Sequence, residues 1–215
     1  FYMCFGKVPK KEIVKAFDVS LILYAEHGFN ASTFTARTIT SSLSDIHGAI
    51  TGAIASLKGS LHGGANEEVM HMLKKIKKPE NAEKWILDAL EKKKLIMGFG
   101  HRVYSKGDSR VPTMKKYYLK VAELLNEKNL PKMSQVIEDI MLEKKNIHPN
   151  VDYDTGPTYH MMGFDTDFFT PIFVISRITG WSAHIMEQHA ANKLIRPLSK
   201  YSGEKHRKVM LLNQR

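Results

Sequence analysis

The sequence predicts an all-α protein, and three observations carry this prediction. Apolar residues recur three and four positions apart in most segments of the 215-residue chain. Asparagine, aspartate, glycine and proline stand at the ends of these segments, where helices begin and end. No segment alternates strongly between apolar and polar residues, and no Asn-Gly pair marks a hairpin. The length allows one large domain or two modest ones.

The first three helices are predicted within the N-terminal 58 residues. Residues 11–26 are apolar on more than one face, which indicates a helix buried on several sides. Gly28 can adopt the left-handed conformation that commonly ends a helix. Asn30 is predicted to cap a second helix, which runs to Ser41. Residues 45–58 are rich in glycine and alanine, so we expect a helix that packs closely against a neighbour.

The rest of the chain follows the same pattern. Further helices are predicted at residues 67–77, 80–93, from Pro112 onward, and at 133–145, 168–179 and 181–193. Residues 146–153 are predicted to form a loop. Gly180 is interpreted as a break between the last two helices, and Pro197 ends the helical pattern before a basic tail.

Composition limits the classes of function. The net charge of +10 and the pI near 9.5 fit nucleic acid or an anionic small substrate as a partner. The lysines lie in short runs that are typical of solvated helix ends. Cys4 is the only cysteine, so an intrachain disulfide and a thiol-rich zinc site are excluded. No apolar run reaches the ~18 residues of a membrane span. The chain starts at Phe1 without a signal-peptide pattern, and we expect a piece of a longer protein.

A histidine turn at residues 60–66 is the strongest local motif. His62 precedes two glycines there, and Asn66 is predicted to cap the helix that follows. The positive end of that helix would disfavour protonation of His62 and leave a neutral donor for a carbonyl oxygen. The alternative is a surface turn with an idle histidine.

Three histidines share this setting. His27, His62 and His101 each stand beside glycine at the end of a predicted element. Asp152 lies in a predicted loop, and arginines at positions 110, 177 and 196 can hold an anion. This set of residue types suits proton abstraction next to a carbonyl group in an anionic substrate.

The motifs around these residues resemble the citrate synthase family. The resemblance covers nearly the whole chain, in the family's order, and lies in Ala25–His27, Asn30–Thr33, Leu61–Asn66, Gly98–Tyr104, Pro149–Asp152, and the segments around Arg177 and Arg196-Pro197. Within the family, the sequence is most similar to the 2-methylcitrate synthase branch in four segments: Tyr24–Arg37, Thr170–Arg177, Gly180-Trp181 and His184–Gln188.

The resemblance implies a two-domain helical fold and a condensation reaction. Residues 1–62 and 157–215 would belong to a large domain around a small domain at 63–156. The substrates would be oxaloacetate and acetyl-CoA or propionyl-CoA, with the coenzyme A thioester as a substrate and no cofactor or metal. The family further implies a homodimer and a cytoplasmic location, or the mitochondrial matrix if a transit peptide precedes the chain.

The resemblance also implies roles for single residues. Asp152 would remove the α-proton of the thioester, His62 would stabilise the enol or enolate, and His101 would hydrogen-bond or protonate the ketone of oxaloacetate. Oxaloacetate would be held by His27, Arg110 and Arg177, and by Arg196 from the neighbouring subunit. Coenzyme A would be bound at Leu95, Gly98, Phe99, Gly100, Lys145 and Asn150.

Some features depart from the family or leave alternatives open. Ser109 and Ser60 stand where the family commonly has proline, and Gly28 stands where many members carry an acid. The remaining histidines are interpreted as surface or packing residues. Two alternatives remain: a basic helical nucleic-acid binder, which rests on charge alone, and a related citryl-CoA lyase. One methylene separates the two acyl groups, so the sequence leaves the acyl preference open.

Overall fold

The computed structural model of the chain describes residues 1–101, 103–104 and 106–214, and Arg102 of the histidine motif lies outside this part. The described residues form α-helices, short 3₁₀ turns and one isolated bridge between Phe99 and Pro149, without a strand. The α-helices are α1 (Tyr2–Phe5), α2 (Lys11–Tyr24), α3 (Ala31–Ser41), α4 (Ile46–Leu57), α5 (Ala65–Ile76), α6 (Ala82–Glu91), α7 (Val111–Leu124), α8 (Asn129–Lys145), α9 (Val151–Met161) and α10 (Phe169–Ala190). The predicted all-α class is confirmed.

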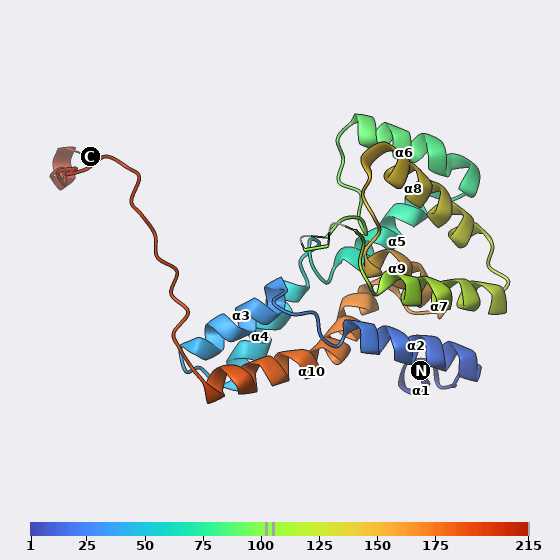
Figure 1. The fold of residues 1–215 in the computed structure, drawn as a ribbon, viewed down its shortest axis with the longest axis horizontal. Coiled ribbons are helices and arrows are strands. Elements are labelled where there is room, and N and C mark those ends of the chain that lie inside the picture. The colour runs from blue at the N-terminus through green and yellow to red at the C-terminus, as the bar shows by residue number, and fades with distance from the viewer. Residues whose placement is uncertain (102, 105, 215) are drawn as a thin grey trace.

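The helices gather in two groups in Figure 1. Helices α5 to α9 form one group, whereas α3 and α4 lie beside the C-terminal half of α10. Helix α2 packs on α7 and α10 and joins the groups. Buried apolar residues from both groups form one continuous core cluster. The predicted domain boundaries fall in the turn before α5 and inside α9, and the division stays a prediction.

Two side-chain helix caps are present, and the one at Asn30 was predicted from the sequence. The side chain of Asn30 accepts a hydrogen bond from the amide of Thr33 at the start of α3. Asp45 accepts one from the amide of Gly48 at the start of α4. Each side chain satisfies an amide that the first helical turn leaves unpaired.

The prediction of a cap at Asn66 is wrong. Helix α5 begins at Ala65 with Gly64 as its N-cap, and Asn66 lies inside the helix with its side chain fully buried. Helix α2, which was predicted over residues 11–26, ends earlier than predicted, at Tyr24. Gly28 does adopt a left-handed conformation, with φ of 55°, but in the segment after the helix.

The predicted loop at residues 146–153 is wrong at its end. Helix α9 begins at Val151, and Asn150 caps it by accepting from the amide of Asp152. Most residues of α9 are buried, so its sequence lacks the alternation of apolar and polar faces by which a helix is predicted. Asp152 therefore stands in the first turn of a helix and not in a flexible loop.

The predicted break at Gly180 is also wrong. Helix α10 is continuous over 22 residues. A Cβ at position 180 would lie 2.3 Å from the carbonyl oxygen of Ala25. Glycine is used here because α10 passes directly against the chain at the end of α2.

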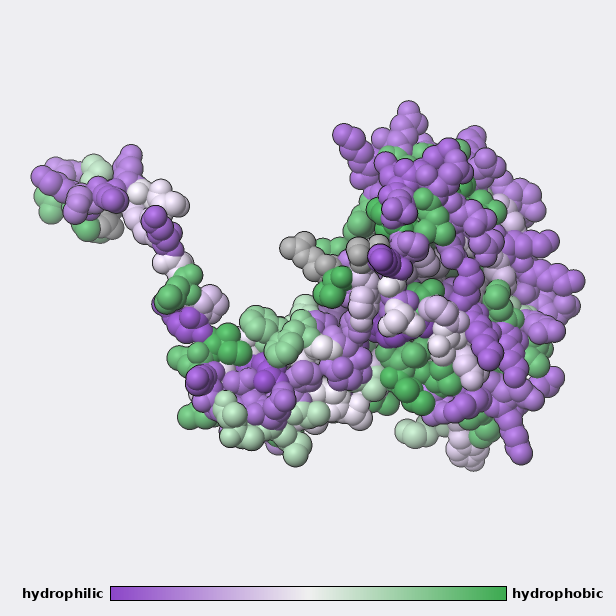
Figure 2. Space-filling view, in the orientation of Figure 1, coloured by the Kyte–Doolittle hydropathy of each residue, from purple (hydrophilic) through white to green (hydrophobic). Residues whose placement is uncertain are grey.

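The surface differs between the two groups of helices. Figure 2 shows hydrophilic residues over most of the α6–α8 side and a mixture of hydrophobic and hydrophilic residues over α3, α4 and α10. After α10 the chain runs away from the body as an extended tail (Figure 1). Among the described residues, no helix has the combination of length and apolar character that crossing a membrane requires.

Candidate active site

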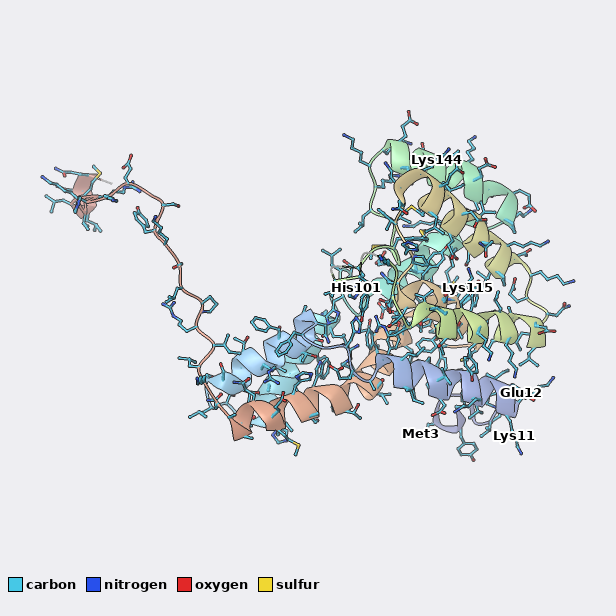
Figure 3. The ribbon with its side chains drawn as sticks, viewed as in Figure 1. Met3, Lys11, Glu12, His101, Lys115 and Lys144 are labelled. Carbon is cyan, nitrogen blue, oxygen red and sulfur yellow. The ribbon has the colours of Figure 1, made fainter. Side chains whose placement is uncertain are left out.

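One cavity of about 730 Å³ lies where the two groups of helices meet. Its walls come from the segment after α2, the histidine turn, the loop before α7, the start of α9 and the N-terminal half of α10. His101 lies on the loop between the two groups (Figure 3). The predicted site residues that line it are His27, His62, Gly100, His101, Arg110, Asn150, Asp152 and Arg177.

The C-terminal end of α2 holds both guanidinium groups of the cavity. The carbonyl oxygen of Leu23 accepts from Nη1 of Arg110 at 3.4 Å. The carbonyl oxygen of Tyr24 accepts from Nε of Arg177 at 2.6 Å. Helix C-termini leave carbonyl groups unpaired and carry partial negative charge, so they suit cations.

Arg110 is fixed by a second contact. Its Nε and Nη2 donate to the two oxygens of Asp108 at 3.0 and 2.7 Å. Asp108 is buried, and its Oδ2 also accepts from the amide of Val151 at 3.3 Å. Although burial opposes ionisation, Arg110 holds the pKa of Asp108 below its usual value. The pair thus ties the arginine to the start of α9.

Arg177 is the less neutralised of the two arginines. It is buried, its guanidinium lies 4.8 Å from the ring centre of Phe173, and Nη1 has no hydrogen-bond partner among the described residues. Burial, together with the charge of Arg110, lowers its pKa to about 10. A buried donor without a partner is costly, so this group is suited to binding an anion from the cavity.

Hydrogen bonds between residues 98–100 and residues 148–150 position the start of α9. The amide of Asn150 donates to the carbonyl of Gly98 at 2.8 Å, and its side-chain Nδ2 donates to the carbonyl of Gly100 at 3.0 Å. The amide of Gly100 donates to the carbonyl of His148 at 2.8 Å. These bonds hold the loop of His101 beside the first turn of α9.

Asp152 presents a carboxyl group with one engaged oxygen. Its Oδ1 accepts from the hydroxyl of Tyr24 at 2.5 Å, and its Oδ2 has no hydrogen-bond partner in the part of the chain that is described. Burial raises the pKa of Asp152 to about 6, while Tyr24, Arg110 and Arg177 act in the opposite direction. The group is ionised at neutral pH and more basic than an ordinary aspartate.

His62 is held as a neutral imidazole. Its Nε2 accepts from the amide of Ser32 at 3.2 Å, and the hydroxyl of Ser32 lies 2.7 Å from the same nitrogen. In a neutral ring that accepts through Nε2, the proton is on Nδ1. Burial is the largest cause that lowers the pKa of His62 to about 4, followed by the charge of Arg177. The predicted neutral form agrees with this direction, and the predicted contribution of the helix end stays a prediction.

The glycines after His62 serve the fold of the turn. A Cβ at Gly63 would lie 2.8 Å from the carbonyl oxygen of Leu57, and one at Gly64 would lie 2.8 Å from that of Lys58. The turn therefore packs tightly against the end of α4. These glycines allow a close approach of backbone to backbone, and not of backbone to a ligand.

His27 and His101 form a pair. Their Nε2 atoms are 2.9 Å apart, and Nδ1 of His101 accepts from the amides of Val103 and Tyr104 at 3.1 and 3.2 Å. The proton of a neutral His101 is therefore on Nε2, and His27 accepts it. Burial lowers the pKa of both rings, that of His27 to about 4.

The structure does not bring every predicted residue to the cavity. Gly98 and Phe99 lie behind the wall, where Phe99 packs on Tyr153. Leu95 and Lys145 are exposed. Arg196 is exposed in the tail and donates to the carbonyl of Pro197 at 2.8 Å. The described residues hold no group of three histidine, cysteine or acidic side chains that fits a metal ion.

Sequence reasoning missed four residues that support the site. Tyr24 and Asp108 contact Asp152 and Arg110, and Ser32 contacts His62. Ser32 also accepts from the indole of Trp181 at 3.1 Å. Tyr24, Ser32 and Asp108 each lie within five positions of a predicted site residue, which was the available signal.

The chain is similar to known proteins over nearly its whole length. A family model described as "Citrate synthase, C-terminal domain" matches residues 1–198. A 2-methylcitrate synthase of Mycobacterium tuberculosis is 57% identical over 206 residues, covering 96% of this chain and 52% of that protein. A citrate synthase of Mycolicibacterium smegmatis is 54% identical over 208 residues, covering 97% and 56%.

A solved structure shows the same fold. The citrate synthase of Thermoplasma acidophilum, in a ternary complex with carboxymethyl coenzyme A and oxaloacetate, is 38% identical with a TM-score of 0.88. The match covers 100% of this chain and 58% of that one. The chain thus spans a little more than half the length of these relatives. By sequence and by fold, the chain belongs to the citrate synthase family.

Proposed function

We propose that this chain supplies the catalytic residues of an enzyme that condenses acyl-CoA with oxaloacetate, forming citrate from acetyl-CoA or 2-methylcitrate from propionyl-CoA. The observation that carries the proposal is the placement of three groups on one cavity: the free oxygen of Asp152, the Nδ1 proton of His62 and the unpaired donor of Arg177. The relatives that carry these two names support the choice of reaction.

The first step is removal of a proton from the α-carbon of the thioester. Oδ2 of Asp152 accepts that proton, and the electron pair moves to the thioester oxygen. The Nδ1 proton of His62 hydrogen-bonds this oxygen as charge develops on it. A positioned base contributes roughly 10²–10⁴-fold and an oxyanion donor roughly 10²–10³-fold, so both groups are required.

The second step joins the two substrates. The enolate carbon attacks the ketone carbon of oxaloacetate, and the Nε2 proton of neutral His101 hydrogen-bonds the ketone oxygen as negative charge develops on it. The proton that Asp152 removed returns through solvent to this oxygen. His27, which accepts a hydrogen bond from Nε2 of His101 in the free protein, is released to contact oxaloacetate. Arg110 and Arg177 bind the carboxylates of oxaloacetate. Water then hydrolyses the thioester and releases coenzyme A.

Coenzyme A is proposed to bind near Gly100 and Asn150, which line the cavity, and to extend along Leu95, Gly98, Phe99 and Lys145. We further propose a cytoplasmic homodimer in which Arg196 of one chain enters the site of the other. The exposed position of Arg196 in an extended tail supports this role, because the tail leaves the body of its own chain. The nucleic-acid alternative rests on net charge alone and is not proposed.

The test is release of free thiol from acetyl-CoA and propionyl-CoA in the presence of oxaloacetate. Asp152→Asn and His62→Ala are expected to abolish turnover while far-ultraviolet circular dichroism stays unchanged. Comparing the two thioesters decides the acyl preference. Incubation with citryl-CoA distinguishes a lyase, which would produce acetyl-CoA and oxaloacetate. Wild-type rates in both variants would overturn the proposed roles.

A further inference from the structure

Tyr24 lies outside the cavity yet contacts its base. We propose that Tyr24 is a positioning residue for Asp152, whose hydroxyl holds Oδ1 so that Oδ2 is the oxygen that takes the substrate proton. This inference rests on the condensing function proposed above. It assigns a role to a residue of α2 that neither binds substrate nor exchanges a proton with it.

The hydroxyl of Tyr24 has a defined direction. Nδ2 of Asn66 donates to the hydroxyl oxygen at 3.3 Å, and the hydroxyl lies 2.5 Å from Oδ1 of Asp152. An amide nitrogen only donates, so the hydroxyl oxygen accepts on that side. Its proton is left for the ionised carboxylate, which only accepts. The two hydrogen bonds thus point the same way, with Asn66 donating to Tyr24 and Tyr24 donating to Asp152.

The ring of Tyr24 has little freedom to move. It is fully buried, and it stacks on Phe173 with ring centres 3.7 Å apart and planes 20° from parallel. Its own carbonyl oxygen accepts from Arg177. Because Phe173 and Arg177 line the cavity, the same residue fixes the base, one wall and an anion-binding group.

The hydrogen bond acts on orientation and on charge. A carboxylate without such a contact can rotate about its last bond and present either oxygen to the substrate. The side chains that act on the pKa of Asp152 are Tyr24 from α2, Arg177 from α10, and Arg110 and Asp108 before α7. Tyr159 of its own helix is a neutral phenol whose pKa burial and the charge of Asp152 raise, and it does not act on the carboxylate in return. The bond from Tyr24 stabilises the ionised form and opposes the effect of burial, which raises the pKa of Asp152 to about 6.

The chain offers a matched control. Tyr159 on α9 is also fully buried, and its hydroxyl lies 2.9 Å from that of Ser20 on α2. Tyr24→Phe and Tyr159→Phe therefore each remove one buried hydroxyl that links α2 to α9. Only the first removes the contact with Asp152.

The experiment compares the pH dependence of kcat in the wild-type protein, Tyr24→Phe and Tyr159→Phe. In Tyr24→Phe, loss of a hydrogen bond to the ionised base is expected to move the acid limb upward by about one pH unit. We expect kcat at the optimum to fall about tenfold because the carboxylate is less well oriented, with KM for oxaloacetate little changed. Tyr159→Phe should keep the wild-type profile.

Three results would overturn the inference: an unmoved acid limb in Tyr24→Phe, an equal shift in both variants, or a loss confined to KM. If Tyr24→Phe does not fold, 3-fluorotyrosine at position 24 replaces it. Its hydroxyl is a stronger donor, so the acid limb should move to lower pH, and no movement refutes the role.

A second measurement separates this inference from the proposed function. The ¹³C signal of the Asp152 carboxyl group, assigned with Asp152→Asn, is titrated in the wild type and in Tyr24→Phe. Absence of thiol release from the wild-type protein would refute the condensing function. The titration would still decide the contact, since an unchanged pKa of Asp152 in Tyr24→Phe refutes it.

Discussion

Substitution of Gly180 by alanine tests whether the close passage of α10 against the end of α2 builds the site. A Cβ at this position would lie 2.3 Å from the carbonyl oxygen of Ala25, whereas ordinary contacts begin at 3.4 Å. The backbones must therefore separate by about 1 Å, because the atom in the way is backbone and cannot rotate aside.

The expected loss of stability follows from two opposing effects. Overpacking in a filled interior costs about 1–3 kcal/mol, and a rigid backbone neighbour places this site at the upper end. Alanine gains about 1 kcal/mol over glycine within a helix. We therefore expect Gly180→Ala to lower the free energy of unfolding by about 2 kcal/mol. Since Arg177 is bound to the carbonyl of Tyr24, KM for oxaloacetate should rise as well.

The assay is urea unfolding followed by circular dichroism, together with KM for oxaloacetate. Gly48→Ala is the control, because its added Cβ would meet only the side chains of Ser44 and Asp45. That variant should be as stable as the wild type or more so, with unchanged KM. Equal stability of Gly180→Ala and the wild type would refute the packing argument, and lower stability with unchanged KM would refute its link to the site.

Three further predictions concern charge. Asp108→Asn leaves Arg110 without its buried anion, and we expect a loss of about 3 kcal/mol in urea unfolding at pH 7. Because folding lowers the pKa of Asp108, ionised Asp108 stabilises the folded protein above the unfolded-state pKa of 3.8, and this stabilisation is lost as the pH falls through the folded-state pKa. If the stability of the variant fell with acid in the same way as that of the wild type, this reasoning would be contradicted. Asp152→Asn should instead stabilise the protein at pH 7, by at most about 3 kcal/mol. Folding raises the pKa of Asp152 to about 6, so ionisation of this group opposes folding as the pH rises from about 4 to 6. A lower stability of the variant at pH 7 would count against this reasoning. Lys145→Ala should raise KM for acyl-CoA and leave that for oxaloacetate unchanged, whereas Lys144→Ala should change neither, and equal effects would remove Lys145 from the coenzyme A site.

The helices that could be predicted from the sequence have one apolar and one polar face and carry a capping or helix-breaking residue at their ends. Asn30 caps α3 as expected, because a cap acts within one turn and needs no tertiary contact. Helix α9 was missed because it is buried on nearly all sides and contains Gly156 and Pro157. A helix without a polar face has no amphipathic period to read.

The cap prediction at Asn66 failed for a related reason. The same side chain can cap a helix or be buried within one, and only the contact with Tyr24 decides between them. That contact joins residues 42 positions apart. Local propensity carries no information about such a partner.

The residue types of the site were predictable, but their supports were not. Histidine beside glycine, an isolated aspartate and separate arginines are unusual enough to be noticed, and most of them line the cavity. Ser32, Asp108 and Tyr24 are ordinary residues whose importance comes only from the atoms they contact in the folded chain.

The charge of the cavity argues for a contribution from a second chain. Arg110 and Arg177 line it, but Asp108 pairs with Arg110, and Glu26 and Asp152 add two carboxylates. The three histidines are neutral, so the described residues of one chain supply little net positive charge for a substrate with two carboxylates. We therefore propose that an additional guanidinium takes part, with exposed Arg196 as its source. Arg196→Ala should raise KM for oxaloacetate without lowering stability, and adding an inactive Asp152→Asn chain that retains Arg196 should restore binding in mixed dimers. Unchanged KM in Arg196→Ala would show that one chain binds the dianion alone.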